Sequence, residues 1–298
     1  MMEASSRIGL RITTYNRASY LNDFFARNEA ILSSPNVNVR VFDNHSTDET
    51  ENIVWNQVYK RSNLSYYRWP ENVGFDRSLA LAIEKEDSSS DYLWWCADDD
   101  IIAHDALDMV QKIIREINPD VIFINYSAYN VLESGVLELI AQPQYKVACN
   151  GPYGTMSNLA NFFRSILPVV PSFGCFVIKR SLVDFIDTKS HIGTHHAYIG
   201  FVLNALARKA REVSPARIGV THDPLFYINK NEGTKTWSGK NDHVIAGVRR
   251  LLSEFYPEYN EAVREVWPEY EKFYFNYAFG DRREFLEELR SAERFFFE

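Results

Sequence analysis

The sequence has few cysteines and no long apolar run. Its three cysteines, Cys96, Cys149 and Cys175, are an odd number without close pairs, which argues against a disulfide framework and a zinc ribbon. The most apolar stretch, 166–178, contains two prolines and is shorter than the roughly 20 residues that cross a bilayer. The first residues lack the apolar core of a secretory signal. We therefore expect a soluble protein of a reducing compartment, the cytoplasm.

Positive charge is also in deficit. Lys and Arg number 32 against 40 Asp and Glu, which gives a formal net charge of -8. This sign disfavours a nucleic-acid backbone and an anionic membrane as broad partners, so we expect no nucleic-acid partner. Aromatic residues are plentiful, with 17 Tyr and 20 Phe, and many lie in 273–297. There they favour helix packing or a homo-oligomer interface over the alternative, a peripheral contact with the inner face of the cell membrane.

Short apolar runs alternate with helix-like segments over the first 126 residues. The strand-like runs are 8–13, 37–42, 64–68, 92–96 and 121–126, and the helix-like segments are 20–32, 47–59, 75–85 and 106–117. This alternation predicts an α/β fold with a mostly parallel central sheet flanked by helices. In such sheets the ligand crevice lies beyond the carboxyl ends of the strands, so candidate site residues are sought there.

The pattern is looser after residue 126. We expect extended chain over 129–148, a helix over 158–167 and a strand over 173–178, with helix starts at Ser181 and near His195. No repeat or low-complexity linker marks a boundary. We place it after residue 228, so that 1–228 form one domain and 229–298 a mainly helical C-terminal extension.

Three aspartates, Asp98, Asp99 and Asp100, follow the buried run 92–96. Adjacent carboxylates repel one another and need compensation. A Mg²⁺ or Mn²⁺ ion held by these three residues supplies it and leaves positions for substrate phosphates. In the alternative, Asp100 caps the next helix and the other two are solvated, but one cap explains only one aspartate.

The other strand ends also carry polar residues. After the first run, small and hydroxylic residues such as Thr14 let the backbone approach a ligand, and Arg17 can face a phosphate. The alternative is a helix N-cap by Thr14, Asn16 or Ser19. Asp43 follows the second run, where a carboxylate can accept hydrogen bonds from a ribose or a base, with capping as an equal alternative. Arg77 stands in the first turn of the third helix, where a cation indicates a nearby anion.

Taken together, four segments resemble glycosyltransferase family 2 on a GT-A (Rossmann-like) fold. They are Thr-Tyr-Asn-Arg (14–17), Asp-Asn-His-Ser-Thr-Asp (43–48), Glu-Asn-Val-Gly-Phe (71–75) and Ala-Asp-Asp-Asp (97–100). Their order and spacing fit the family over roughly the first third of the chain. Segments 171–180 and 233–237 are similar to a bacterial subgroup typified by abequosyltransferases, which add 3,6-dideoxyhexoses to surface polysaccharide repeat units.

The resemblance implies a nucleotide-sugar donor (UDP-, CDP- or dTDP-linked), a divalent metal, inversion at the anomeric carbon, and a saccharide or lipid-linked saccharide acceptor. It implies that Thr14 and Tyr15 frame the nucleobase, with Arg17 and Arg77 near the phosphates. Asp43 would bind the base or ribose. The acidic motif Asp-x-Asp-Asp would hold the metal and the diphosphate.

This sequence departs from the family pattern at two points. Ala97 stands where that motif has its first carboxylate. The metal ligands implied are therefore Asp99 first and then Asp98. Thr13 also stands where many members have proline.

Many members of the family take the general base from a Glu-Asp pair in the second half of the chain, and this sequence has no convincing pair there. The corresponding region contains His195 and His196, and histidine has a suitable unperturbed pKa. Capping and solvation at a helix start are the equal alternative. His222 is a second candidate, as metal ligand or base, with Asp223 to orient it. A polar loop bounded by proline is the alternative there.

The loop around Trp237 can close over substrate or pack down as an anchor. Two other functions remain open: a sugar nucleotidyltransferase, and a catalytically silent carbohydrate- or nucleotide-sugar-binding protein. The first would need a glycine-rich phosphate loop after the first strand, which 13–16 does not provide.

Overall fold

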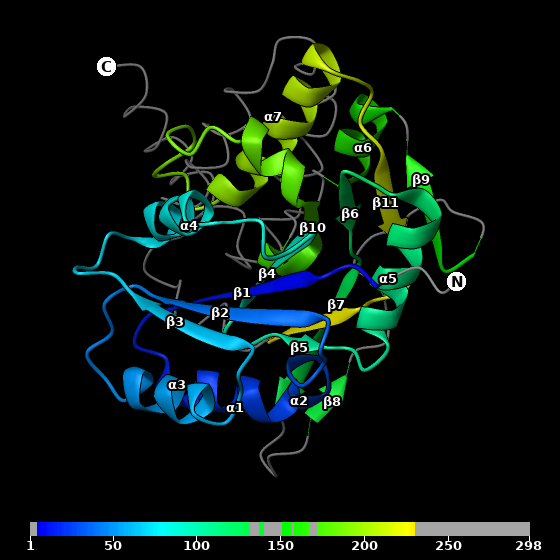
Figure 1. Cartoon of the computed structure of the whole chain (residues 1–298). Helices are drawn as coiled ribbons and strands as arrows, with labels where there is room; N and C mark the ends of the chain where they lie inside the picture. The colour runs from blue at the N-terminus through cyan, green and yellow to red at the C-terminus, as the bar shows by residue number, and fades with distance from the viewer. Residues whose placement is uncertain (1–4, 132–136, 140–150, 157, 167–171, 230–298) are drawn as a thin grey trace, which may run out of the picture.

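The computed structural model of the chain describes residues 5–131, 137–139, 151–156, 158–166 and 172–229. Within them helices cover a central sheet, in a mixed α/β architecture (Figure 1). The predicted helical C-terminal extension, the Trp237 loop and the aromatic segment lie outside the described residues from residue 230 onward. Among the described residues, no helix combines the length and the apolar character needed to cross a membrane.

The central sheet has the strand order β3-β2-β1-β4-β10-β6-β11-β9. Its strands are β1 (Ile8–Thr14), β2 (Val37–Asp43), β3 (Leu64–Arg68), β4 (Tyr92–Ala97), β6 (Val121–Phe123), β9 (Tyr153–Met156), β10 (Phe176–Lys179) and β11 (Ile218–Thr221). In the part of this sheet that the structure describes, β10 and β9 alone run antiparallel to their neighbours. The expected mostly parallel sheet is confirmed, and its central strands are buried as apolar runs between two helical layers should be.

The register of the parallel strands gathers their carboxyl ends. Thr14 pairs with Asp43 across β1 and β2, and Asp43 pairs with Arg68 across β2 and β3. On the other side of β1, Thr13 pairs with Ala97 of β4. The segments that follow these four strands therefore meet at one edge of the sheet.

A second, smaller sheet has the order β5-β12-β7-β8. Its strands are β5 (Ile101–Ile102), β7 (Tyr126–Val131), β8 (Leu137–Leu139) and β12 (Phe226–Asn229). The single strand predicted over 121–126 is therefore wrong, because β6 and β7 belong to different sheets. Between them, the Asn125 amide N–H donates to Thr221 Oγ1 and its side-chain Nδ2 donates to the His222 carbonyl, both at 2.8 Å. These bonds stabilise the crossing from one sheet to the other.

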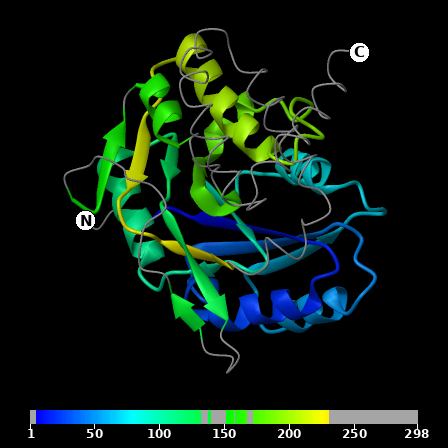
Figure 2. The same ribbon diagram turned by 180° about the vertical axis from the view of Figure 1, so that it is seen from behind.

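Figure 1 shows α1, α2 and α3 on one side of the main sheet and α4 and α7 on the other, and Figure 2 shows the same layers from behind. The helices are α1 (Ala18–Arg27), α2 (Glu29–Leu32), α3 (Thr50–Val58), α4 (Phe75–Glu84), α5 (Ala106–Ile117), α6 (Leu159–Ile166) and α7 (Ala197–Glu212). The helix expected from Ser181 is instead the 3₁₀ helix η2 (Arg180–Phe185). The one expected near His195 begins at Ala197.

Candidate active site

The turn between β4 and β5 carries two carboxylates, those of Asp98 and Asp99, and both bind the guanidinium of Arg17. Asp98 Oδ2 accepts a hydrogen bond from the Thr14 hydroxyl at 2.7 Å, and its Oδ1 accepts one from Arg17 Nε at 2.7 Å. The Arg17 Nη2 group donates to Asp99 Oδ2 at 2.5 Å. The structure thus brings together four predicted site residues from the ends of β1 and β4, with Arg17 bridging both aspartates.

Asp100 has a different role from the one predicted. Its carboxylate is only 2% exposed and accepts a hydrogen bond from the Ala97 amide at 2.9 Å, which closes the turn. Burial, together with the Asp99 charge, raises the pKa of Asp100 well above its ordinary value. The capping alternative is also wrong, because α5 begins at Ala106 with Asp105 before it. Asp100 therefore stabilises the backbone of the acidic turn from its buried side and does not face a ligand.

Two residues that the sequence did not single out hold the backbone of this turn. Asn28 Nδ2 donates to the Asp100 carbonyl at 3.0 Å, while its Oδ1 accepts the Ile102 amide at 2.8 Å. The Tyr129 hydroxyl donates to the Asp99 carbonyl at 2.9 Å. Asn28 lies inside the segment 20–32 expected as one helix, so no signal in the sequence marks it, and Asp100 and Ile102 lie more than 70 residues away in sequence.

The donor set fits a divalent cation held by few protein ligands. Among the described residues, no three or more His, Cys, Asp or Glu side chains could together hold an ion. Mg²⁺ and Mn²⁺ are commonly held by one or two carboxylates plus substrate phosphates. The Asp99 side chain is 16% exposed and that of Asp98 is 5% exposed. Burial and the Asp99 charge raise the pKa of Asp98 while Arg17 acts in the opposite direction, so one guanidinium only partly compensates the two carboxylates.

Asp43 does not face a ligand as expected. It is fully buried, and its carboxylate accepts hydrogen bonds from the Ser46 amide at 2.8 Å, the Ser46 hydroxyl at 2.5 Å and the Tyr66 hydroxyl at 2.6 Å. The Ser46 hydroxyl oxygen in turn accepts the Asn16 amide at 2.9 Å. Asp43 therefore supports the β1 and β2 loops from inside, and the neighbouring Tyr15 side chain stays exposed.

Arg77 is also directed elsewhere than expected. Its guanidinium forms an ion pair with Glu84 of the same helix at 3.6 Å, with both side chains 41% exposed. The negative charge near Arg77 is therefore a protein carboxylate at the far end of α4, and the structure gives no support to a phosphate contact.

The two predicted histidines precede α7 and differ in burial. His195 is partly exposed and has a left-handed backbone conformation, with φ of 58°. His196 is 9% exposed, its Nδ1 lies 3.4 Å from the Tyr198 hydroxyl, and its Nε2 has no partner among the described residues. Burial, with a contribution from His195, lowers the pKa of His196 to about 3. His196 is therefore poorly suited to accept a proton, and His195 is the better candidate base.

The buried His196 predicts a pH effect on stability. Its pKa in the folded protein, about 3, lies below the unfolded value near 6.5, so the unfolded chain binds the extra proton. Stability is unaffected by this group above about pH 6.5 and falls as the pH drops toward 3. Between pH 7 and 4.5, His196→Gln should lose about 2 to 3 kcal/mol less unfolding free energy than the wild type.

Urea unfolding at several pH values measures this difference. His195→Gln is the control, because it keeps the buried His196 ring. Parallel curves for His196→Gln and wild type would contradict it.

His222 and Asp223 form the hydrogen-bonded pair considered from the sequence. His222 Nδ1 lies 2.9 Å from Asp223 Oδ1, and the side chains are 49% and 69% exposed. His222 does not join the aspartates in a shared metal shell within the described residues. The predicted metal role of His222 therefore has no support here, and a catalytic role for Asp223 stays a prediction.

Comparison with known proteins places this site in a family context. The model of "Glycosyl transferase family 2" matches residues 10–186, more than half of the chain. Abequosyltransferase RfbV of Salmonella typhimurium is 32% identical over 110 residues, which are 36% of this chain and 32% of that protein. The chain thus spans about a third of the length of that curated relative.

Solved structures show the same fold at low identity. S. aureus TarS 1–349 superposes with a TM-score of 0.58 at 19% identity, covering 91% of this chain and 72% of TarS. The mannosyltransferase PcManGT from Pyrobaculum calidifontis, solved with GDP-Man and Mn²⁺, gives 0.59 at 12% identity, covering 98% and 76%. At such identities the likeness establishes the GT-A fold and leaves the substrates open.

Proposed function

The chain belongs to glycosyltransferase family 2, and we propose that it is a metal-dependent, inverting glycosyltransferase. It would move a sugar from a nucleoside-diphosphate sugar to a hydroxyl of a saccharide acceptor. The observation that carries this proposal is the pair Asp98 and Asp99, joined by Arg17 at the carboxyl edge of the sheet. Such an edge is where α/β folds bind nucleotides, and an anionic leaving group needs positive charge there.

Each residue of the edge has a chemical part in this reaction. Asp99 first, and then Asp98, would hold Mg²⁺ or Mn²⁺, which supplies charge stabilisation to a departing diphosphate when bound. Arg17 adds a second positive charge beside the same carboxylates. Thr14 orients Asp98 through its hydroxyl, and the exposed Tyr15 ring offers a flat face to a nucleobase.

The transfer itself requires one base. The acceptor oxygen forms a bond to the anomeric carbon while the bond to the diphosphate oxygen breaks, and the electron pair leaves with the nucleoside diphosphate. The acceptor proton passes to a ring nitrogen of His195. A single displacement of this kind inverts the anomeric configuration, as it does in inverting glycosidases.

The proposed substrates follow from the family and from its curated relative. UDP-, CDP- and dTDP-linked sugars are the proposed donors. A lipid-linked saccharide in bacterial surface polysaccharide synthesis is the proposed acceptor, supported by the partial match to Abequosyltransferase RfbV. We place the reaction in the cytoplasm, with a peripheral position on the inner face of the cell membrane as the alternative. The residues from 229 onward, including Trp237, would form the acceptor side, and a homo-oligomer stays a proposal.

A thermal-shift panel tests this proposal. The panel contains UDP-GlcNAc, GDP-mannose, CDP-glucose and dTDP-glucose, each with Mn²⁺ and with EDTA. A donor at about 100 times its Kd stabilises the native state by about 2.7 kcal/mol, which raises the unfolding midpoint by about 5 to 10 °C. We expect this shift for one nucleotide class with Mn²⁺ and its loss with EDTA.

The other outcomes distinguish the alternatives. Equal shifts and equal turnover in Mn²⁺ and EDTA would contradict metal dependence. Release of pyrophosphate from a nucleoside triphosphate would support a sugar nucleotidyltransferase. Donor binding with neither hydrolysis nor transfer would support a silent binding protein.

A further inference from the structure

Asp76 lies in the first turn of α4, and its carboxylate is buried against the loop that precedes α7. Its Oδ2 accepts the amide hydrogens of Gly193 at 2.9 Å and His195 at 2.8 Å, and its Oδ1 accepts that of Ala197 at 3.3 Å. Asp76 is 5% exposed, and these partners lie 117 to 121 residues further along the chain. One side chain therefore holds three backbone groups of a distant loop.

This loop needs such support because of its backbone conformation. Gly193 has φ of 87° and His195 has φ of 58°, both in the left-handed region. A residue other than glycine holds this conformation when surrounding contacts enforce it. His196, at the N-cap position of α7, makes no side-chain capping bond. Asp76 thus supplies from α4 the acceptor and the negative charge that the N-terminus of α7 favours.

Aromatic contacts place this loop beside the acidic turn. Phe75, next to Asp76, packs edge to face on Phe173 at 5.5 Å, and Phe173 packs on Tyr198 of α7 at 5.4 Å between ring centroids. Phe173 begins the 3₁₀ helix η1 (Phe173–Cys175). A methyl group added at Gly174 of η1 would lie 3.2 Å from Asp100 Oδ2. The start of α7 is thus joined through η1 to the turn that carries Asp98 and Asp99.

Burial raises the pKa of Asp76 above its ordinary value. The amide hydrogen bonds from His195, Ala197 and Gly193 and the charge of His195 oppose this rise without cancelling it. A carboxylate that accepts several amide hydrogens is held firmly in one orientation. It also favours the positive charge that His195 acquires when it takes a proton.

We propose that Asp76 is a positioning residue for glycosyl transfer, which holds His195 in the orientation that receives the acceptor proton. This rests on the proposed function, since it takes His195 as the base. Asp76 itself touches no substrate. Its effect should therefore fall on the rate of the chemical step and leave donor binding at the acidic turn largely unchanged.

The test compares Asp76→Ala and Asp76→Asn with a matched control, Asp120→Ala. Asp120 is also 5% exposed, and its Oδ2 accepts the Arg217 amide at 2.9 Å and pairs with Lys209 at 3.1 Å, at the amino end of β6. The substrate is the nucleotide sugar that the thermal-shift panel selects, with its hydrolysis or transfer as the reaction. KM, kcat and unfolding midpoint are measured for each variant of the full chain.

We expect Asp76→Ala to lower kcat by about 100-fold with KM changed by less than about threefold. Asp76→Asn keeps an oxygen for the Gly193 and His195 amides, so it should lose less. Asp120→Ala should lower the unfolding midpoint without lowering kcat. Amide hydrogen exchange should rise in Gly193–Ala197 for both Asp76 variants, and this measurement can be made even where Asp76→Ala folds poorly.

Two results would overturn the proposal. In one, Asp76→Asn shows faster exchange over Gly193–Ala197 while both Asp76 variants keep the wild-type kcat, which leaves a purely structural cap. In the other, kcat falls equally in Asp76→Ala and Asp120→Ala, which reports general destabilisation. Failure of the proposed function is seen separately, because the wild-type chain would then turn over no nucleotide sugar, and the role of Asp76 would fall with it.

Discussion

Asp99→Asn is expected to leave a folded protein whose glycosyl transfer is slower by about 1,000-fold. The Asp99 side chain is the more exposed of the two carboxylates at the acidic turn, so it is the first ligand available to Mg²⁺ or Mn²⁺. Loss of one ligand removes several kcal/mol of stabilisation from the departing diphosphate, and each 1.36 kcal/mol is about tenfold in rate. Stability should change little, because the substitution mainly weakens one partly exposed hydrogen bond from Arg17.

The measurement is kcat at saturating Mn²⁺ together with a Mn²⁺ titration of donor binding. Asp184→Asn is the matched control, since it also removes one carboxylate paired with an arginine, Arg180, on an exposed surface of η2. We expect the control to keep the wild-type rate. An Asp99→Asn protein with wild-type turnover and an unchanged Mn²⁺ dependence would contradict the assignment of the metal to this residue.

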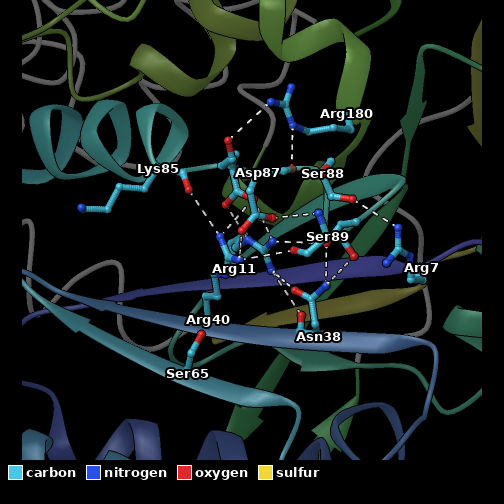
Figure 3. Close-up of polar contacts among 12 residues, drawn as sticks. Arg7, Arg11, Asn38, Arg40, Ser65, Lys85, Asp87, Ser88, Ser89 and Arg180 are labelled. Atoms are coloured by element: carbon cyan, nitrogen blue, oxygen red, sulfur yellow. Dashed lines mark hydrogen bonds and ion pairs between the residues drawn. The ribbon is translucent and has the colours of Figure 1, made fainter.

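Glu86→Ala should be among the most destabilising substitutions in the chain. Arg11 Nε and Nη2 donate to the two Glu86 carboxylate oxygens at 2.5 and 2.8 Å, and both side chains are fully buried. Asn38 and Ser90 complete the hydrogen bonds of the guanidinium. Figure 3 shows Arg11 among polar contacts with Asn38 close to it. Removing Glu86 leaves a buried cation without a counter-charge, which costs about 3 to 5 kcal/mol.

Thermal unfolding should therefore show a midpoint lowered by about 6 to 20 °C for Glu86→Ala. Removing the other partner, in Arg11→Met, should cost less unfolding free energy, because Arg40 lies 3.8 Å from Glu86 and can compensate its charge. The double variant Arg11→Met with Glu86→Leu should recover much of the stability, since no charge is left buried. Purely additive losses in the double variant would contradict this account. The network lies at the amino ends of β2 and β4, so kcat of the folded fraction should not change.

The part of the fold built from alternating segments could be predicted well from the sequence. Strands β1 to β4 and the helices between them follow local hydrophobic periodicity, and the structure confirms most of them with small changes at their ends. The single helix expected over 20–32 is wrong, because the helical segment breaks at Asn28 into α1 and α2. The crossing at Asn125 could not be predicted, because the run 121–126 is almost continuously apolar. It depends on hydrogen bonds to Thr221 and His222, which are 96 and 97 residues away.

The candidate site divides in the same way. Asp98, Asp99, Thr14 and Arg17 follow strands whose parallel order the sequence indicates, so their meeting at one edge was predictable. The roles of Asp43 and Asp100 were not. Both are carboxylates at the same edge, yet each is buried and accepts hydrogen bonds from nearby protein groups.

The amino-acid sequence alone determined the family, the α/β class and the edge of the sheet at which the chemistry lies, because these follow from short motifs and local periodicity. Tertiary structure decided how far each carboxylate at that edge is buried: the Asp99 side chain is partly exposed, while Asp98, Asp100 and Asp43 are buried and hydrogen-bonded. It also decided that a buried aspartate of α4, Asp76, holds the loop before α7. The physical reason is that burial and hydrogen-bond partners come from residues far away in the chain, and these set the charge and accessibility of each side chain.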